Sequence, residues 1–186
     1  MTTGTNKPKK RVWAFPTLAA SLLALILFHD LTSPSHASIR SIEGITIKVA
    51  DGDTVTVLTL EDTKLRVRLQ GIDAPEIQHG RQPDQPYGVE AKRALWEKVL
   101  GRRVILEIHD IDRYKRVVGI LRIGSRNINE EMVVEGWAWA YREYMKGPYA
   151  SEFILLERRA REKRLGLWRQ YNPQPPWEFR RQSRKR

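Results

Sequence analysis

The chain has 186 residues, with 33 Lys and Arg against 22 Asp and Glu and a formal net charge of +11. Such a surplus of cations favours polyanionic partners, because lysine and arginine displace counterions from phosphates, although a need for solubility would also explain it. There is no cysteine, which excludes disulfides, thiolate metal sites and cysteine nucleophiles, so any metal ion must be bound by oxygen or imidazole.

The N-terminal segment, residues 1–37, has the order of an export signal. Four cations in residues 7–11 precede an uncharged apolar run over residues 12–28, and Ser35-His36-Ala37 resembles a cleavage site. The run has a length between that of a signal core and that of a spanning helix. We therefore expect a signal peptide or an uncleaved membrane anchor, with the remainder secreted or periplasmic, or tethered through residues 12–28 outside the cytoplasm.

Beyond residue 40 the pattern changes to short stretches of alternating apolar and polar residues. The stretches predicted to be strands are 45–49, 54–57, 65–69, 104–108 and 117–123. Helical spacing predicts helices over 89–100, 127–136 and 151–165, the first of them ending at Gly101. Residues 169–186 form a Pro-containing basic tail that we predict to be irregular.

Five short strands, with helices after the third and after the fifth, indicate an α+β fold that is mainly β. The arrangement favours a five-stranded OB-fold Greek-key barrel with three helices. A length of 186 residues gives room for one domain with an ordinary core plus something at the ends, so we expect one folded domain over residues 43–168, between the export segment and the tail.

Two acidic segments stand at predicted strand ends. Asp51-Gly52-Asp53-Thr54 joins the first two strands, and Asp73-Ala74-Pro75-Glu76 follows the third. Alone, the first is a common hairpin turn and the second a helix-capping box. Together they place several carboxylates in a basic domain, and clustered carboxylates need a cation. Oxygen ligands without cysteine or a neighbouring histidine suit a hard ion such as calcium.

Two arginines accompany these acids. Arg68 lies on the third strand, and Arg116 ends the segment Asp112-Arg113-Tyr114-Lys115-Arg116 before the fifth strand. Guanidinium groups bind phosphate oxygens with two hydrogen bonds and stabilise the charge that develops in phosphoryl transfer. Arginines beside a carboxylate and metal cluster are typical of a phosphodiesterase.

These segments, together with Tyr87-Gly88-Val89-Glu90-Ala91, resemble the thermonuclease (staphylococcal nuclease-like) family over about residues 43–168. The resemblance implies one catalytic Ca²⁺, bound by Asp53, Asp73 and the backbone carbonyl of Ala74. It implies that Glu76 orients or deprotonates the attacking water and that Arg68 and Arg116 bind the scissile phosphate. Lys115 departs from the pattern, because it stands where the family's well-known member has glycine.

The resemblance also implies substrate contacts and products. Tyr114 would donate a hydrogen bond to a phosphate, and Tyr141 or Tyr144 would pack against a base or sugar. The substrates would be DNA and RNA, cleaved in endo and exo modes to leave 3′-phosphate ends, by a monomer. A non-catalytic nucleic-acid-binding barrel, a scaffold facing anionic lipid, and a calcium-binding protein without hydrolysis are the alternatives.

Overall fold

The computed structural model describes Met1 and residues 40–77, 84–142 and 148–183. The folded unit spans Ile39–Arg186. The predicted signal or anchor, Met1 apart, and Tyr144 lie outside the described residues. Within those described ranges, no helix is both long enough and apolar enough to cross a membrane.

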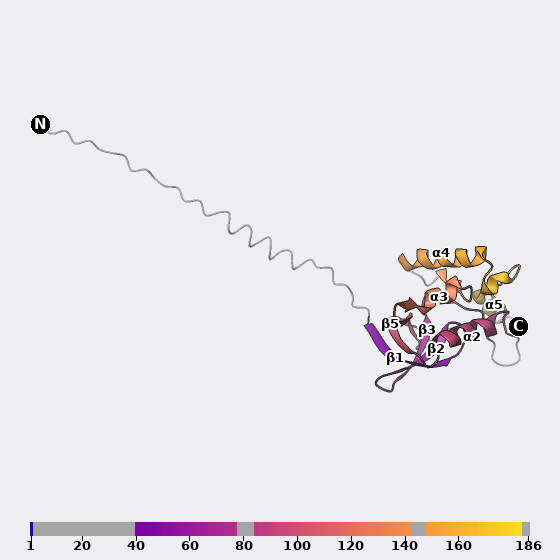
Figure 1. Cartoon of the computed structure of the whole chain (residues 1–186), viewed down its shortest axis with the longest axis horizontal. Helices are drawn as coiled ribbons and strands as arrows, with labels where there is room; N and C mark the ends of the chain where they lie inside the picture. The colour runs from indigo at the N-terminus through magenta and orange to yellow at the C-terminus, as the bar shows by residue number, and fades with distance from the viewer. Residues whose placement is uncertain (2–39, 78–83, 143–147, 184–186) are drawn as a thin grey trace. The chain divides into compact units, whose positions relative to one another are not determined.

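Five strands close into a barrel (Figure 1). They are β1 (Arg40–Val49), β2 (Thr54–Thr59), β3 (Lys64–Leu69), β5 (Arg103–Ile111) and β6 (Val117–Ile123). Their order is β3-β2-β1-β5-β6, and a parallel pairing of β3 with β6 closes the ring. The short β7 (Arg126–Asn127) extends β6 as an antiparallel neighbour. The predicted five-stranded OB-like barrel is therefore confirmed.

Alternation along the strands determines which side chains face the interior of the barrel. Val55, Val57 and Val67 are fully buried, whereas Thr56 and Arg66 between them lie on the outer face. The register of β1 shifts between Thr46 and Lys48, and that of β5 between Ile108 and Asp110. Such bulges bend a strand and increase its twist, which helps a sheet of only five strands to close.

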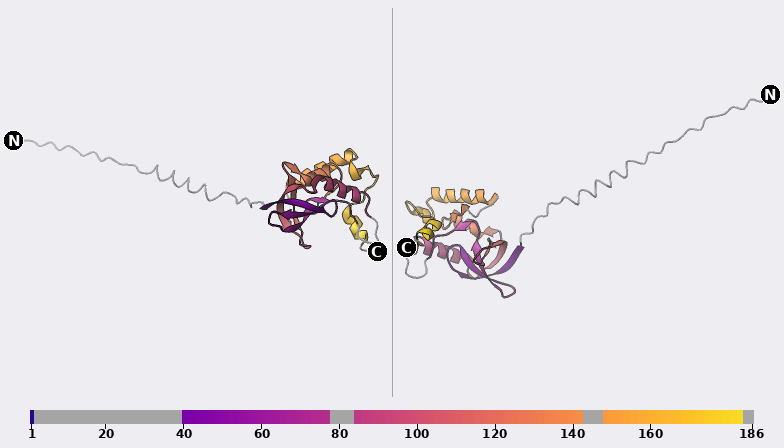
Figure 2. Two further views of the ribbon diagram at one scale, coloured as in Figure 1. Left: turned by 60° about the horizontal axis from the view of Figure 1, so that its bottom comes forward. Right: turned by 180° about the vertical axis from the view of Figure 1, so that it is seen from behind.

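Four helices accompany the barrel in the described part of the chain (Figure 2). They are α2 (Gly88–Val99), α3 (Ile128–Val134), α4 (Pro148–Glu162) and α5 (Pro176–Ser183), with a 3-10 turn η2 (Gly166–Arg169) before the last. Helix α2 buries Ala91, Leu95 and Val99 in the core, as amphipathic spacing requires. The three predicted helices are thus found, with ends that differ by a few residues.

Helix α5 corrects the prediction that residues 169–186 are irregular. Pro176 starts the helix at the position where proline is best tolerated, and it is buried. Trp177 packs edge-on against Trp139, with ring centroids 5.6 Å apart, and stacks on Tyr141 at 5.5 Å. The helix forms because this aromatic contact anchors it, and such a long-range contact does not appear in local composition.

A second, two-stranded sheet carries part of the candidate site. In it β4 (Ile72–Asp73) pairs with β8 (Trp139–Ala140), which places Asp73 opposite Trp139. Residues 74–77 are not helical, so the segment Asp73-Ala74-Pro75-Glu76 is not the helix cap that its residues would also allow.

Candidate active site

The two acidic segments meet at one end of the barrel. Asp53 Oδ2 accepts a hydrogen bond of 2.9 Å from the backbone N–H of Ala74, and the Asp53 carbonyl accepts one of 2.8 Å from Leu69. The hydroxyl of Thr54 donates to Asp53 Oδ1 at 3.0 Å. These bonds fix the carboxylate of Asp53 beside the chain that follows β4.

Gly52 permits this close approach. A Cβ atom at position 52 would lie 2.6 Å from the Cβ of Ala74 and 2.9 Å from that of Ala91. Any larger residue would separate the turn from the segment 73–76, so glycine is required here by packing rather than by backbone conformation.

Arg68 bridges the two aspartates. Its Nη1 lies 2.8 Å from Asp53 Oδ2 and its Nη2 lies 2.7 Å from Asp73 Oδ1. One guanidinium therefore spans both carboxylates, which places their oxygens within reach of a single positive charge. Asp73 is completely buried, and Asp53 is 7% exposed.

The acids are crowded enough to perturb their ionisation. Burial, followed by repulsion from Asp53, raises the pKa of Asp51 to about 8. Burial also raises the pKa of Asp73, against the opposing effect of Arg68. Burial raises the pKa of Glu76 as well, although a hydrogen bond from Arg180 opposes the shift. A cluster of carboxylates that resists ionisation is stabilised by any bound cation.

Glu76 is held through its backbone. Its N–H donates to Gln85 Oε1 at 3.0 Å, and its carbonyl accepts from the N–H of Gln85 at 2.9 Å. Gly88 at the start of α2 leaves no room for a Cβ, which would lie 2.6 Å from the Glu76 carbonyl oxygen. The segment after β4 is thus packed against the N-terminal end of α2, and Glu76 has a defined place beside the aspartates.

Arg180 on helix α5 is a member of the site that the sequence analysis did not predict. Its Nη2 lies 2.8 Å from Asp73 Oδ2, and its Nη1 donates to Asp73 Oδ1 at 3.1 Å and also to Glu76 Oε1. It comes from the tail that was predicted to be irregular. The aromatic and proline residues just before it, Pro175-Pro176-Trp177, were the available signal that this tail packs onto the domain.

The segment 112–116 forms a turn between β5 and β6. Arg116 Nε donates to Asp112 Oδ2 at 2.7 Å, and Tyr114 is 58% exposed. Burial of Asp112 tends to raise its pKa, but hydrogen bonds from the backbone and guanidinium of Arg116 lower it overall. Lys115 has a φ of 59°, in the left-handed region that favours glycine, so lysine keeps the turn at a cost in backbone strain.

The structure thus brings together Asp53, Asp73, Ala74, Glu76 and Arg68. Arg116 and Tyr114 lie on the neighbouring turn, where Arg116 pairs with Asp112. Tyr141 follows β8, and its ring stacks on Trp177 with an interplanar angle of 17°.

The residues fit a hard cation. Both carboxylates already surround one positive group, and all ligand atoms available from Asp53, Asp73 and the Ala74 carbonyl are oxygens, as calcium prefers. Among the described residues, no three His, Cys, Asp or Glu side chains form a metal-binding group.

Comparison with known proteins identifies the family. The family model described as "Staphylococcal nuclease homologue" matches residues 66–170. The chain is 36% identical to "Protein ParB" of Escherichia coli, over 96% of this chain and 97% of that protein. It is 36% identical to "Micrococcal nuclease" of Shigella flexneri, over 92% and 96%. It is also 39% identical to "Staphylococcal-like nuclease CAN1" of Arabidopsis thaliana, over 65% of this chain and 35% of that protein. The chain therefore belongs to the staphylococcal nuclease family, and it is a nuclease.

Proposed function

We propose that this nuclease hydrolyses phosphodiester bonds of DNA and RNA in a calcium-dependent reaction that leaves 3′-phosphate ends. The observation that supports the proposal most strongly is the pair Asp53 and Asp73, which are buried and bridged by Arg68, with Glu76 beside them. Burial raises the pKa of Asp73, and a dication bound beside it would stabilise its charged form.

Calcium would be held by Asp53, Asp73 and the carbonyl of Ala74. When bound there, it would supply positive charge to a phosphate oxygen of the substrate and help to lower the barrier to attack at phosphorus. Calcium would compete with arginine for the oxygens of Asp73, because Oδ1 accepts hydrogen bonds from Arg68 and Arg180 and Oδ2 accepts one from Arg180.

The other residues bind and move protons. Arg68, freed in part from the aspartates, donates to the scissile phosphate and stabilises the charge on its oxygens. Glu76 orients water for in-line attack and accepts its proton. Burial raises the pKa of Glu76 towards neutral pH, and a general base is most effective when its pKa lies near the working pH. Arg116 reaches the phosphate from the 112–116 turn, and Tyr114, exposed on that turn, donates to a neighbouring phosphate.

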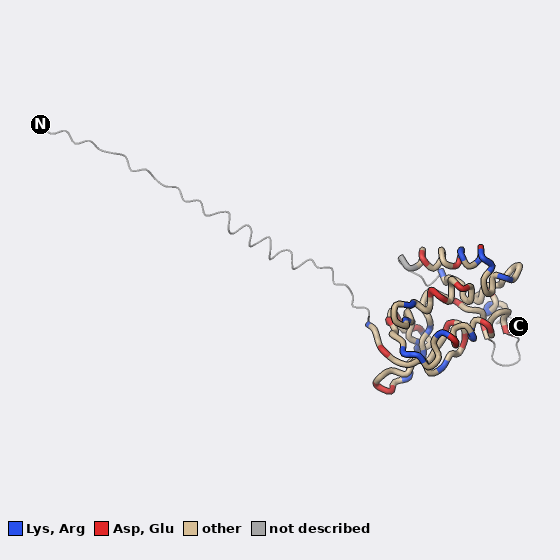
Figure 3. The backbone as a smooth tube through the Cα atoms, in the orientation of Figure 1, with Lys and Arg blue, Asp and Glu red and all other residues tan. Residues whose placement is uncertain are grey.

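Nucleic acid selectivity is expected to be weak. Most of the proposed contacts are to phosphates, which carry no sequence information. Tyr141 is proposed to contact a base or sugar, which requires Trp177 to share or yield the face on which it now stacks. Lys, Arg and acidic residues are interspersed over the folded unit (Figure 3), so binding would depend on local groups of cations rather than on one uniformly basic face.

The proposal extends to location and assembly. Residues 1–37 would direct the domain out of the cytoplasm, either as a cleaved signal or as an anchor through residues 12–28, and the protein would act as a monomer. Expression of the full chain in a bacterium, followed by fractionation and N-terminal sequencing, tests this. A nuclease that starts at Met1 and stays in the cytosol would contradict export.

The activity is tested by incubating the purified protein with single-stranded and duplex DNA and with RNA, with calcium or with a chelator. Glu76→Gln should lower kcat by about 10²–10⁴-fold, the range typical of loss of a general base. Glu97→Gln on α2 is the matched control, since the side chain of Glu97 is 55% exposed and its one ion pair among the described residues is with Arg93, one helical turn away. Full activity in the chelator would refute calcium dependence.

Product analysis tests the end groups separately. Fragments that a polymerase extends only after phosphatase has removed a phosphate from their 3′ end would support 3′-phosphate products. Fragments that a polymerase extends without treatment would show 3′-hydroxyl ends and refute that part of the proposal.

A further inference from the structure

Helix α5 joins the active site to the C-terminal segment. Arg180 forms a two-pronged pair with Asp73 and a further contact with Glu76, so one guanidinium touches both a proposed metal ligand and the proposed base. Its side chain is 31% exposed, whereas that of Asp73 is completely buried. The guanidinium therefore lies at the boundary between the buried aspartate and the solvent.

The C-terminal segment is built into the domain by three further contacts. Gln85, 3% exposed, donates from Nε2 to the carbonyl of Gln174 at 2.7 Å while its Oε1 accepts from the backbone of Glu76. Trp177 packs against Trp139, and Pro176 is buried. Gln85 thus connects the backbone of the base to the backbone of the tail. A segment held at several buried points is part of the domain, unlike a tail attached by one ion pair.

We infer that Arg180 is a positioning residue of the active site, which holds the carboxylate of Glu76 at a defined place beside Asp73. This rests on the proposed function, in which Glu76 activates water and Asp73 binds the metal. With an ion bound at Asp73, the contact between Arg180 and Glu76 would still hold the carboxylate of Glu76 in place. A planar guanidinium suits this role because it donates in fixed directions to two carboxylates at once.

Kinetics and calcium calorimetry on Arg180→Ala test the inference together. Loss of an outer partner of a catalytic group typically costs about 10–100-fold in activity, so kcat should fall by that factor while KM changes little. Calcium should bind as tightly as in the wild type or more tightly, because a competing cation has left Asp73. Arg180→Lys should recover only part of kcat, since an ammonium lacks the planar set of N–H donors that lets a guanidinium bind two carboxylates at once.

Arg181→Ala is the matched control. Arg181 is the next residue on α5, its side chain is 66% exposed, and its ion pair with Glu178 spans 3.9 Å. It should keep wild-type kcat. Free guanidinium at sub-denaturing concentration should restore activity to Arg180→Ala and not to a variant with a merely weakened α5 contact, such as Trp177→Ala.

The outcomes separate the alternatives. Tighter calcium binding with a higher kcat would overturn the inference and make Arg180 an inhibitory lock. Equal effects of Arg180→Ala and Arg181→Ala, or a change in thermal stability alone, would overturn it in favour of a structural tail. A wild type that does not hydrolyse nucleic acid refutes the proposed function and this inference with it, whereas an active wild type matched by Arg180→Ala refutes the inference alone.

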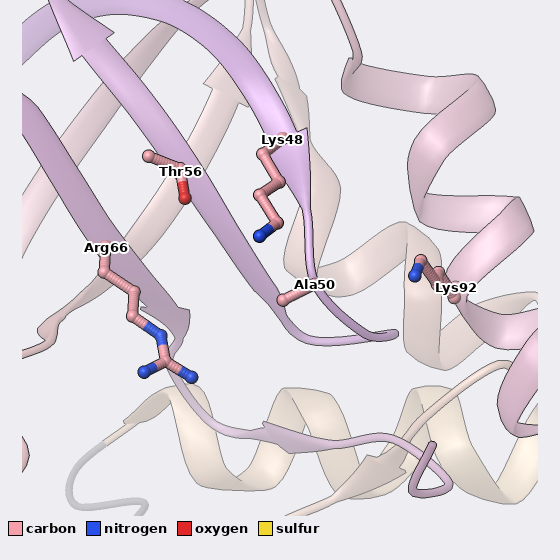
Figure 4. Close-up of a pocket in the computed structure, with 5 residues that line it drawn as sticks. All are labelled: Lys48, Ala50, Thr56, Arg66 and Lys92. Carbon is pink, nitrogen blue, oxygen red and sulfur yellow. The ribbon is translucent and has the colours of Figure 1, made fainter. Parts of the chain in front are cut away.

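A different observation carries a second inference. On the outer face of the barrel lies a pocket of about 520 Å³, lined by Lys48, Ala50, Thr56, Arg66 and Lys92 (Figure 4). Lys48, Thr56 and Arg66 are cross-strand neighbours in one row over β1, β2 and β3, and Lys92 comes from α2. Within the described residues, none of the three cations forms an ion pair, so their charge is available to an anion.

The pocket adjoins the active site along the same face. The pair Thr56 and Arg66 is followed along the strands by Thr54 and Arg68, two residues on, or about 7 Å away. We propose that this pocket binds a backbone phosphate of the nucleic acid substrate, a step away from the phosphate at Arg68. This too rests on the proposed function, since it extends the path of the same polymer.

Fluorescence anisotropy with labelled single-stranded DNA in a chelator tests the pocket without catalysis. Arg66→Gln and Lys92→Gln should each weaken binding and reduce the slope of log K against log salt by about one. Lys163→Gln, an exposed lysine just beyond α4, is the charge-matched control and should have less effect. Equal losses for all three variants would refute a local site, and wild-type protein that binds no nucleic acid at all would instead refute the proposed function.

Discussion

The amide of Asn129 allows a quantitative prediction, because one fully buried side chain links three parts of the domain. Its Oδ1 accepts from the N–H of Leu121 at 3.1 Å, and its Nδ2 donates to the carbonyls of Gln70 and Gly119 at 3.0 and 3.1 Å. It therefore connects α3 to β6 and to the chain that leads from β3 into β4. Since β4 carries Asp73, the hydrogen bond from Asn129 to the Gln70 carbonyl also helps to hold the chain next to the candidate active site.

Asn129→Ala should lower the free energy of unfolding by about 3–4 kcal/mol. A net hydrogen bond contributes about 1 kcal/mol, and the buried partners left unsatisfied add to the loss. The Gly119 carbonyl keeps a bond of 2.9 Å from Gln70, so the full penalty falls on the other two groups. A loss of this size is a large part of the stability of an ordinary domain.

Urea unfolding followed by tryptophan fluorescence measures the effect of Asn129→Ala. Asn127→Ala is the comparison, because Asn127 caps α3 by accepting from the N–H groups of Asn129 and Glu130, and loss of a cap costs about 1 kcal/mol. A loss below about 1 kcal/mol for Asn129→Ala, or one no larger than that of Asn127→Ala, would refute the assignment of Asn129 as the central link.

Three further predictions concern the acids, the turn and the aromatic cluster. Asp51→Asn should stabilise the metal-free protein near pH 8 and not near pH 4. Burial raises the pKa of Asp51 to about 8 in the folded protein, so between pH 4 and pH 8 the folded carboxyl keeps a proton that the unfolded one has lost, and wild-type stability falls as the pH rises. Thermal melts across this range measure the effect, and an equal gain in stability at both pH values would contradict it. Gly52→Ala should weaken calcium binding in calorimetry, because its Cβ would press on that of Ala74, and an unchanged affinity would argue against the close approach. Arg161→Ala should lower stability by roughly 2 kcal/mol in urea unfolding, because it removes a guanidinium that lies over the rings of Trp139 and Trp168 and leaves the buried carboxylate of Glu157 without its partner at 2.8 Å; no measurable loss would show that these contacts are weak.

The barrel could be predicted from the sequence because each of its strands has its own pattern of alternating apolar and polar residues. The alternation of Val55 and Val57 with polar residues, and of Val67 and Leu69 with arginines, follows from which face of a strand meets the core. The acidic turn at Asp51–Asp53 was likewise local, since it lies between the end of one strand and the start of the next. Family resemblance was the basis for predicting which of those acids bind metal or activate water.

The tertiary structure decided the rest. Sequence patterns placed Asp53 and Asp73 at strand ends, but only the fold brings both onto the guanidinium of Arg68. Arg180 lies 107 residues from Asp73 along the chain, and no local pattern relates the two. The tail folds because Trp177 packs against Trp139 and Tyr141, and this contact stabilises α5 only once the domain has folded. Periodicity reports what a residue does within its own strand or helix, whereas pairings across the domain arise only when the barrel closes.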